Sequence, residues 1–268
     1  MKDPLTNSTR EPLSLPERID NHMWSEHHNL NYNLLDPAPW VPKGVLQVYR
    51  TVCFLFFTGL SLFHLITNAH PTLLFFTNWG IFFTAITFII LFVFTIRGAS
   101  SRTTESSPYS PWKTWKWGVF CFETSLTFEF IITVFFWAVL FPLMKGSDPL
   151  MFIDHITPVV CLLIEYSMNR MPFTMKHAKV SVGILLIYGV VNIAKTVATG
   201  EPVYPPLNFK DVMSYIYSVL LIGFEVLNYF ALTHLTQWKL KKMGLVGAPV
   251  EIKGLKEVED EDPEDIQS

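Results

Sequence analysis

The stretch TLLFFTNWGIFFTAITFIILFVFTI, residues 72–96, carries no charged side chain over 25 residues. A helix of about 20 mostly apolar residues is long enough to cross the hydrocarbon core of a bilayer, so this stretch predicts a transmembrane helix. Five further stretches have the same character. We therefore predict an all-α membrane protein with six transmembrane helices, at residues 45–67, 72–96, 116–143, 149–168, 179–199 and 209–235.

The composition of the whole chain fits a membrane protein. Half of the 268 residues are apolar and only 16% are charged, whereas soluble domains carry about 25% charged residues. The net charge of -3 argues against a nucleic-acid partner, which would require concentrated Lys and Arg. The three cysteines, Cys53, Cys121 and Cys161, form neither a disulfide framework nor a zinc pattern. We expect no metal and no cofactor, and membrane lipids as the surrounding partners.

The distribution of basic residues predicts the orientation of the chain. Short connections at 68–71 and 145–148 make neighbouring helices antiparallel, and an even number of spans puts both termini on one side. Eleven basic residues lie close to helix ends on that side: Lys43, Arg97, Arg102, Lys113, Lys116, Arg170, Lys176, Lys179, Lys239, Lys241 and Lys242. Only Lys145 and Lys210 lie on the other side. The positive-inside rule therefore predicts that both termini are cytoplasmic.

Two polar side chains in different spans are predicted to lie at the same depth. Thr77 follows Pro71 by six residues and His155 follows Pro149 by six residues, and proline is favoured in the first turn of a helix. At the helical rise both would lie roughly 9 Å below the non-cytoplasmic helix ends. His64, near the end of the first span, is close to the same level.

Three interpretations of this polar level are open. In the first, Thr77 and His155 are hydrogen-bond partners that hold helices together. In the second, Thr77 is a nucleophile and His155 is its base, because a threonine hydroxyl needs a base within hydrogen-bond reach. The third is a metal site built from His64, Asp154 and His155, which no known ligand spacing supports. Pro158 cannot donate a hydrogen bond to the Asp154 carbonyl, so we expect the helix to bend there.

Ionisable residues from four predicted helices share a second level nearer the cytoplasm: Arg50, Glu123, Glu165 and Glu225. We interpret them as a network of ion pairs and hydrogen bonds that ties the helices together. Nearer the middle, Glu129, Asn192 and Lys195 lie level, and a Glu129–Lys195 pair would bury both charges at lower cost. A proton or ion pathway through these carboxylates is the alternative, although the broken-helix repeats typical of transporters are not evident.

Four motifs in order resemble the rolling-stone and androgen-induced family of six-span membrane proteins. Residues 75–80 (FFTNWG) are similar to its second-span signature, and residues 155–165 (HITPVVCLLIE) to its fourth-span motif of a histidine followed by an acid. Residues 200–207 (GEPVYPPL) resemble its loop before the last span, and residues 225–229 (EVLNY) resemble the end of its last span. The resemblance extends over about residues 45 to 238 and implies a six-span helical fold.

In the androgen-induced branch the resemblance also implies an enzyme. It is a threonine hydrolase of fatty-acid esters of hydroxy fatty acids, and its motif residues correspond here to Thr77 and His155. In that branch the histidine lies one residue further from the acid, at the place that Asp154 occupies in this chain. Rolling-stone relatives share the pattern seen here. Asn78 is our candidate donor to the oxyanion.

We therefore expect an integral membrane hydrolase whose lipid-ester substrate enters laterally between helices. The alternatives are a non-enzymatic scaffold, fusion factor or complex subunit, and a transporter. The location is the endoplasmic reticulum or the plasma membrane, because positive-inside bias acts alike in both. The chain is divided into a polar cytoplasmic tail (1–44), a six-span domain (45–238) and an acidic cytoplasmic tail (239–268).

Overall fold

The structure is a computed structural model that describes residues 19, 22–24, 36–67, 72–96, 114–144, 146 and 149–245. Within this part of the chain every element is helical, apart from one isolated bridge between Pro37 and Asn169. Six segments are long and apolar enough to cross a membrane, which confirms the predicted fold: Lys43–Thr67, Phe76–Ile96, Trp115–Leu143, Pro149–Met168, Met175–Thr199 and Val212–Lys242. Pro71, the loop at 97–113 and most of both predicted tails lie outside the described residues.

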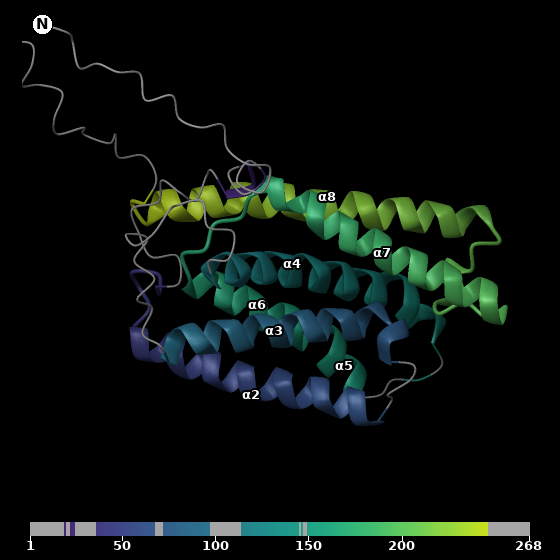
Figure 1. Ribbon diagram of the computed structural model, residues 1–268, viewed down its shortest axis with the longest axis horizontal. Coiled ribbons are helices and arrows are strands. Elements are labelled where there is room, and N and C mark those ends of the chain that lie inside the picture. Colours follow the sequence, from purple (N-terminus) through teal and green to yellow (C-terminus); the bar gives the residue numbers. More distant parts are fainter. Residues whose placement is uncertain are drawn as a thin grey trace, which may run out of the picture.

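Eleven helical elements follow one another along the described part of the chain from Lys43 onward. They are α2 (Lys43–Thr67), η1 (Thr72–Leu74), α3 (Phe76–Ile96), α4 (Thr114–Phe135), η2 (Phe136–Leu140), η3 (Phe141–Leu143), α5 (Pro149–His155), α6 (Thr157–Met168), α7 (Met175–Thr199), η4 (Pro205–Leu207) and α8 (Val212–Lys242). Figure 1 shows the long helices running side by side in alternating directions. We call the end at which α3, α5 and α8 begin the loop end of the bundle.

Helix α4 lies at the centre of the bundle, in contact with α3, α6 and α8. All residues from 122 to 129 are fully buried, and most of them are polar: Glu123, Thr124, Ser125, Thr127 and Glu129. Lipid tails solvate an apolar side chain as well as a neighbouring helix does, so burial within the bundle stabilises the polar face more than the apolar face. The polar sequence of α4 therefore places this helix in the middle.

Two helix boundaries differ from the sequence-based expectation. The second span does not begin its helix at Pro71, because η1 and Phe75 precede the start of α3 at Phe76. Thr77 thus lies in the first turn of α3 and not six residues into this helix. Helix α8 begins after Asp211, whose carboxylate accepts the Ser214 N–H at 2.9 Å, and it continues to Lys242.

The bend expected at Pro158 is confirmed as a break in the fourth span. Helix α5 ends at His155, and Ile156 leaves the helical conformation with φ −122° before α6 begins at Thr157. The hydroxyl of Thr133 on α4 donates to the His155 carbonyl at 2.7 Å. A carbonyl beside the break thus finds its partner on another helix, as a water-free interior requires.

Helices α3 and α4 approach closely at Gly80, and this contact limits what the position can carry. A methyl group added at Gly80 would meet Ile132 Cδ1 at 2.3 Å and Glu129 Oε1 at 2.6 Å. Both side chains are buried, so the added carbon must displace at least one of them. A small residue at a helix contact is the usual device for close packing in membranes.

We expect Gly80→Ala to destabilise the folded protein by about 1–3 kcal/mol, because the added carbon overpacks the contact between α3 and α4. The matched control is Gly223→Ala on α8, where nothing lies within 4 Å of the added carbon. Reversible unfolding in mixed detergent micelles measures both variants. Equal stability of the two would show that the contact at Gly80 is loose.

Candidate functional site

Most of the residues predicted to be polar partners within the membrane are buried, whereas Thr77, Asp154, His155 and Lys195 are half-buried. Several of these residues face helix α2. Arg50 on α2 binds Glu165 on α6, with Nη2 to Oε1 at 2.7 Å. Towards the loop end, His64 Nε2 lies 3.1 Å from Asp154 Oδ1. On the fourth span, Cys161 lies between Asp154 and Glu165, and its carbonyl accepts a hydrogen bond from the Tyr49 hydroxyl on α2. The face of the fourth span that carries Asp154, Cys161 and Glu165 therefore packs on α2.

The other predicted carboxylates belong to separate contacts on the opposite side of α4. Glu123 lies 2.6 Å from the Nδ1 of His177 on α7 and accepts the Thr174 N–H at 3.1 Å. Glu225 on α8 accepts hydrogen bonds from Thr127 on α4 at 2.9 Å and from Ser181 on α7. The level of four ionisable residues is thus divided into three contacts. Sequence reasoning missed His177, because nothing local marks a single histidine at a helix start as a partner.

Glu129 is buried between α3 and α4, away from the lysine considered as its partner. Its Oε1 accepts a hydrogen bond from Thr84 at 3.2 Å. Lys195 instead donates to the carbonyl of Glu201 at 2.7 Å, beyond the end of α7. The Glu129–Lys195 pair is therefore not formed. The long lysine side chain reaches out towards the more polar helix end.

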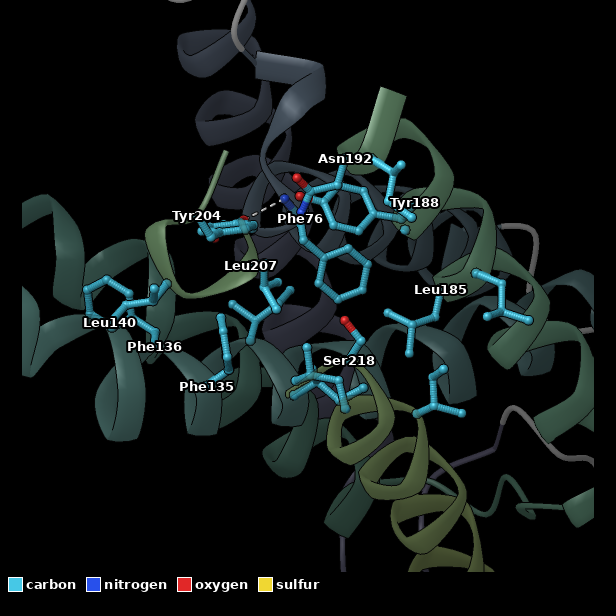
Figure 2. A pocket seen from close by; sticks show the side chains of 18 of the residues that line it. Phe76, Phe135, Phe136, Leu140, Leu185, Tyr188, Asn192, Tyr204, Leu207 and Ser218 are labelled. Atoms are coloured by element: carbon cyan, nitrogen blue, oxygen red, sulfur yellow. Dashed lines mark hydrogen bonds between the residues drawn. The ribbon is translucent and has the colours of Figure 1, made fainter. Parts of the chain in front are cut away.

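An apolar cavity of about 310 Å³ lies at the loop end, enclosed by α3, α4, α5, α7 and α8 with the segment before α8. Figure 2 shows part of its wall, with Phe135, Phe136, Leu185 and Leu207 among the apolar side chains. Thr77 and His155 both line it. The polar side chains of the wall are Thr77, His155, Tyr188, Asn192, Tyr204, Tyr215 and Ser218. None of the described wall residues is Lys, Arg, Asp or Glu.

His155 is held at the cavity by the irregular ends of two helices. It is the last residue of α5, and its ring stacks on Phe136 with centroids 3.5 Å apart and planes 9° apart. Phe136 opens η2, a single widened helical turn of the kind that often accompanies functional sites. The His155 Nδ1 atom is buried and has no hydrogen-bond partner among the described residues. The imidazole therefore retains a free nitrogen.

Thr77 lies in the wall at the start of α3, close to two tyrosines. The Phe76 N–H donates to the Tyr204 hydroxyl at 2.8 Å, and the Tyr188 hydroxyl donates to the Leu74 carbonyl at 2.8 Å. Burial raises the pKa of the Tyr204 phenol, whereas hydrogen bonding with Tyr188, with Phe76 and with Thr77 lowers it. The start of α3, and Thr77 with it, is thus fixed by the loop that contains Tyr204.

Of the supporting residues predicted with this pair, the cavity wall includes only some. Asn78 is buried but does not line the cavity, whereas Asn192 does. His64 and Asp154 pair on the α2 side and are not among the wall residues. Sequence reasoning did not assign a role to Tyr188, Tyr204 or Phe136. Of these three residues, only Tyr204 belongs to a motif that the sequence analysis noted, at residues 200–207.

The cavity reaches the outer surface of the bundle between α7 and α8. These helices lie close together where α7 begins and diverge towards the loop end (Figure 1). Four residues of the wall are also exposed, namely Leu186 (51%), Val190 (65%), Ile193 (43%) and Tyr215 (57%). In a bilayer this opening would face the lipid acyl chains, so an apolar molecule has a lateral entrance.

Within the described part of the chain, no group of three His, Cys, Asp or Glu residues is close enough to hold a metal ion. Comparison with protein-family models, curated proteins and solved structures gave no match.

We expect Glu165→Leu and Arg50→Met each to lower stability by about 3–5 kcal/mol, because each leaves a buried charge without its partner. The side chains of Arg50 and Glu165 are 3% and 0% exposed, respectively, so solvent does not screen the remaining charge. The double variant should lose much less than the sum of the two single losses. Unfolding in mixed micelles gives all three values, and additive losses would contradict direct coupling.

Proposed function

We propose that this protein is an integral membrane lipid-ester hydrolase in which Thr77 is the nucleophile and His155 its base. The observation that carries the proposal is that both residues, from different spans, line one apolar cavity. Ligand cavities of this kind are mostly apolar and carry a few polar groups that orient the ligand. The volume of about 310 Å³ is at the lower end of such sites and suits the reacting part of a lipid and one acyl segment.

The reaction needs only groups of the cavity wall and water. His155 takes the proton of the Thr77 hydroxyl, and the Thr77 oxygen bonds to the ester carbonyl carbon. When the bond to the leaving alcohol breaks, the alcohol oxygen receives the proton from His155. Water then attacks the acyl-threonine, His155 accepts a proton from it, and the Thr77 oxygen regains a proton as the fatty acid leaves.

The site lies at the end of the bundle that the positive-inside rule places away from the cytoplasm. Because α3 begins at Phe76, Thr77 lies in its first turn, and water has a short path to the acyl-enzyme. The substrate enters laterally through the opening between α7 and α8. The resemblance to the androgen-induced branch favours fatty-acid esters of hydroxy fatty acids, in a membrane of the endoplasmic reticulum or the cell surface.

We expect a fluorophosphonate probe to label the purified protein at Thr77, and Thr77→Ala to abolish both labelling and ester turnover. His155→Ala should lower turnover at least about 10³-fold, because the hydroxyl then keeps its proton. The matched control is Ser218→Ala in the same wall, whose hydroxyl already donates to the Ser214 carbonyl at 2.9 Å. Mass spectrometry locates the label. Labelling that persists in Thr77→Ala would remove the proposal.

We expect Gly189→Leu to shorten the acyl chain that the enzyme accepts, because Gly189 lines the cavity and has open space around it. Turnover of a palmitoyl ester should fall about 10-fold or more, while a butyryl ester is retained. Gly183→Leu is the control, since Gly183 on the same helix also has open space but does not line the cavity. Equal losses for both chain lengths would indicate a general defect rather than a filled cavity.

A further inference from the structure

Asn192 on α7 places an amide in the cavity wall that has no partner for its oxygen. The residue is 1% exposed, and its Oδ1 atom makes no hydrogen bond to the described residues. It follows Tyr188 by one helical turn, so both side chains lie on the same face of α7, beside Phe76 (Figure 2). A buried amide is unfavourable in an apolar interior unless a partner is present. The position therefore points to a bound molecule.

The neighbouring hydroxyls of the wall already have partners. Tyr188 donates to the Leu74 carbonyl, Tyr215 to the Phe209 carbonyl at 3.0 Å and Ser218 to the Ser214 carbonyl. The Tyr204 oxygen accepts the Phe76 N–H. Among the polar groups described in this wall, the imidazole of His155 and the amide of Asn192 thus retain atoms with no partner.

We propose that the Asn192 amide binds the carbonyl oxygen of the ester and donates to the oxyanion that forms there. This inference rests on the proposed hydrolase function, and it assigns to Asn192 the role that the sequence suggested for Asn78. An amide side chain can present either its N–H₂ or its oxygen, since the two ends are interchangeable by rotation. The described wall has no Lys or Arg, so a neutral donor must stabilise the charge.

In the proposed step, the negative charge forms on the ester carbonyl oxygen, which the Asn192 amide binds. As the Thr77 oxygen bonds to the carbonyl carbon, the electron pair of the C=O double bond moves to the carbonyl oxygen, and His155 holds the threonine proton. The amide N–H donates to that oxygen until the double bond re-forms and the alcohol leaves. A donor of this kind acts more strongly on the transition state than on the bound ester. Because this donor is neutral, we expect the substrate ester to be uncharged at its reacting end.

The test uses the full-length protein in lipid nanodiscs with para-nitrophenyl octanoate as substrate. We expect Asn192→Leu to lower kcat about 10²–10³-fold with KM changed by less than about threefold. The matched control is Asn228→Leu on α8. Asn228 is also a buried amide with an unpaired nitrogen, but it does not line the cavity. The kcat of the Asn228→Leu variant should match that of the wild type.

A second measurement separates oxyanion binding from a structural role. Wild type should bind octyl trifluoromethyl ketone, which forms a tetrahedral adduct with Thr77, far more tightly than the matching methyl ketone. Asn192→Leu should lose most of this preference, whereas a merely structural change weakens both ketones alike. Should the Leu variant not fold, Asn192→Ala is compared in the same two assays.

The outcomes distinguish this inference from the proposed function on which it rests. If Asn192 variants keep kcat and the ketone preference while Thr77→Ala is inactive, the role of Asn192 is overturned and the hydrolase stands. If wild type shows neither turnover nor labelling at Thr77, both are overturned.

Discussion

The burial of polar side chains in a medium without water is the constraint on which this structure depends. Apolar contacts do not distinguish a neighbouring helix from a lipid tail, so they cannot by themselves fix the order or rotation of helices. The polar face of α4 does so. Glu123 contacts His177 on α7, Thr127 and Ser181 hold Glu225 on α8, and Thr84 on α3 donates to Glu129. Each contact sets one neighbour of the central helix.

The loop end of the bundle follows a different rule, because its helices are irregular. The third span widens into η2 after Phe135 and then tightens into η3, the fourth breaks at Ile156, and α3 starts only after η1. Regular packing of side chains is interrupted at each of these places, and the cavity lies where they meet. The half of the bundle that is linked by polar contacts thus supports a more open half, which contains the cavity.

The proposed chemistry fits this division of the molecule. A hydrolase in a membrane must admit an apolar ester and yet supply it with a nucleophile, a base and water. The opening between α7 and α8 admits the ester. Thr77 lies close to the loop end, which gives water access to it. An enclosed apolar wall also strengthens each hydrogen bond to the reacting atoms, because little solvent competes for them.

Residue patterns alone determined a large part of this fold. Hydropathy located six spans because the free energy of crossing a bilayer is a sum over single residues. Pro158 predicted the break in the fourth span because proline has no backbone N–H to donate. The order of the predicted spans also placed Thr77 and His155 at the same end of the bundle. The predicted start of the helix that carries Thr77 was wrong, because α3 begins at Phe76.

The tertiary structure decided which of these residues meet. No pattern along the chain showed that Lys195 turns away from Glu129, that His177 is the partner of Glu123, or that Asn192 rather than Asn78 lines the cavity. The physical reason is that depth along a helix follows from counting residues, whereas rotation about its axis is set by partners on other helices. A cavity depends on several such rotations at once.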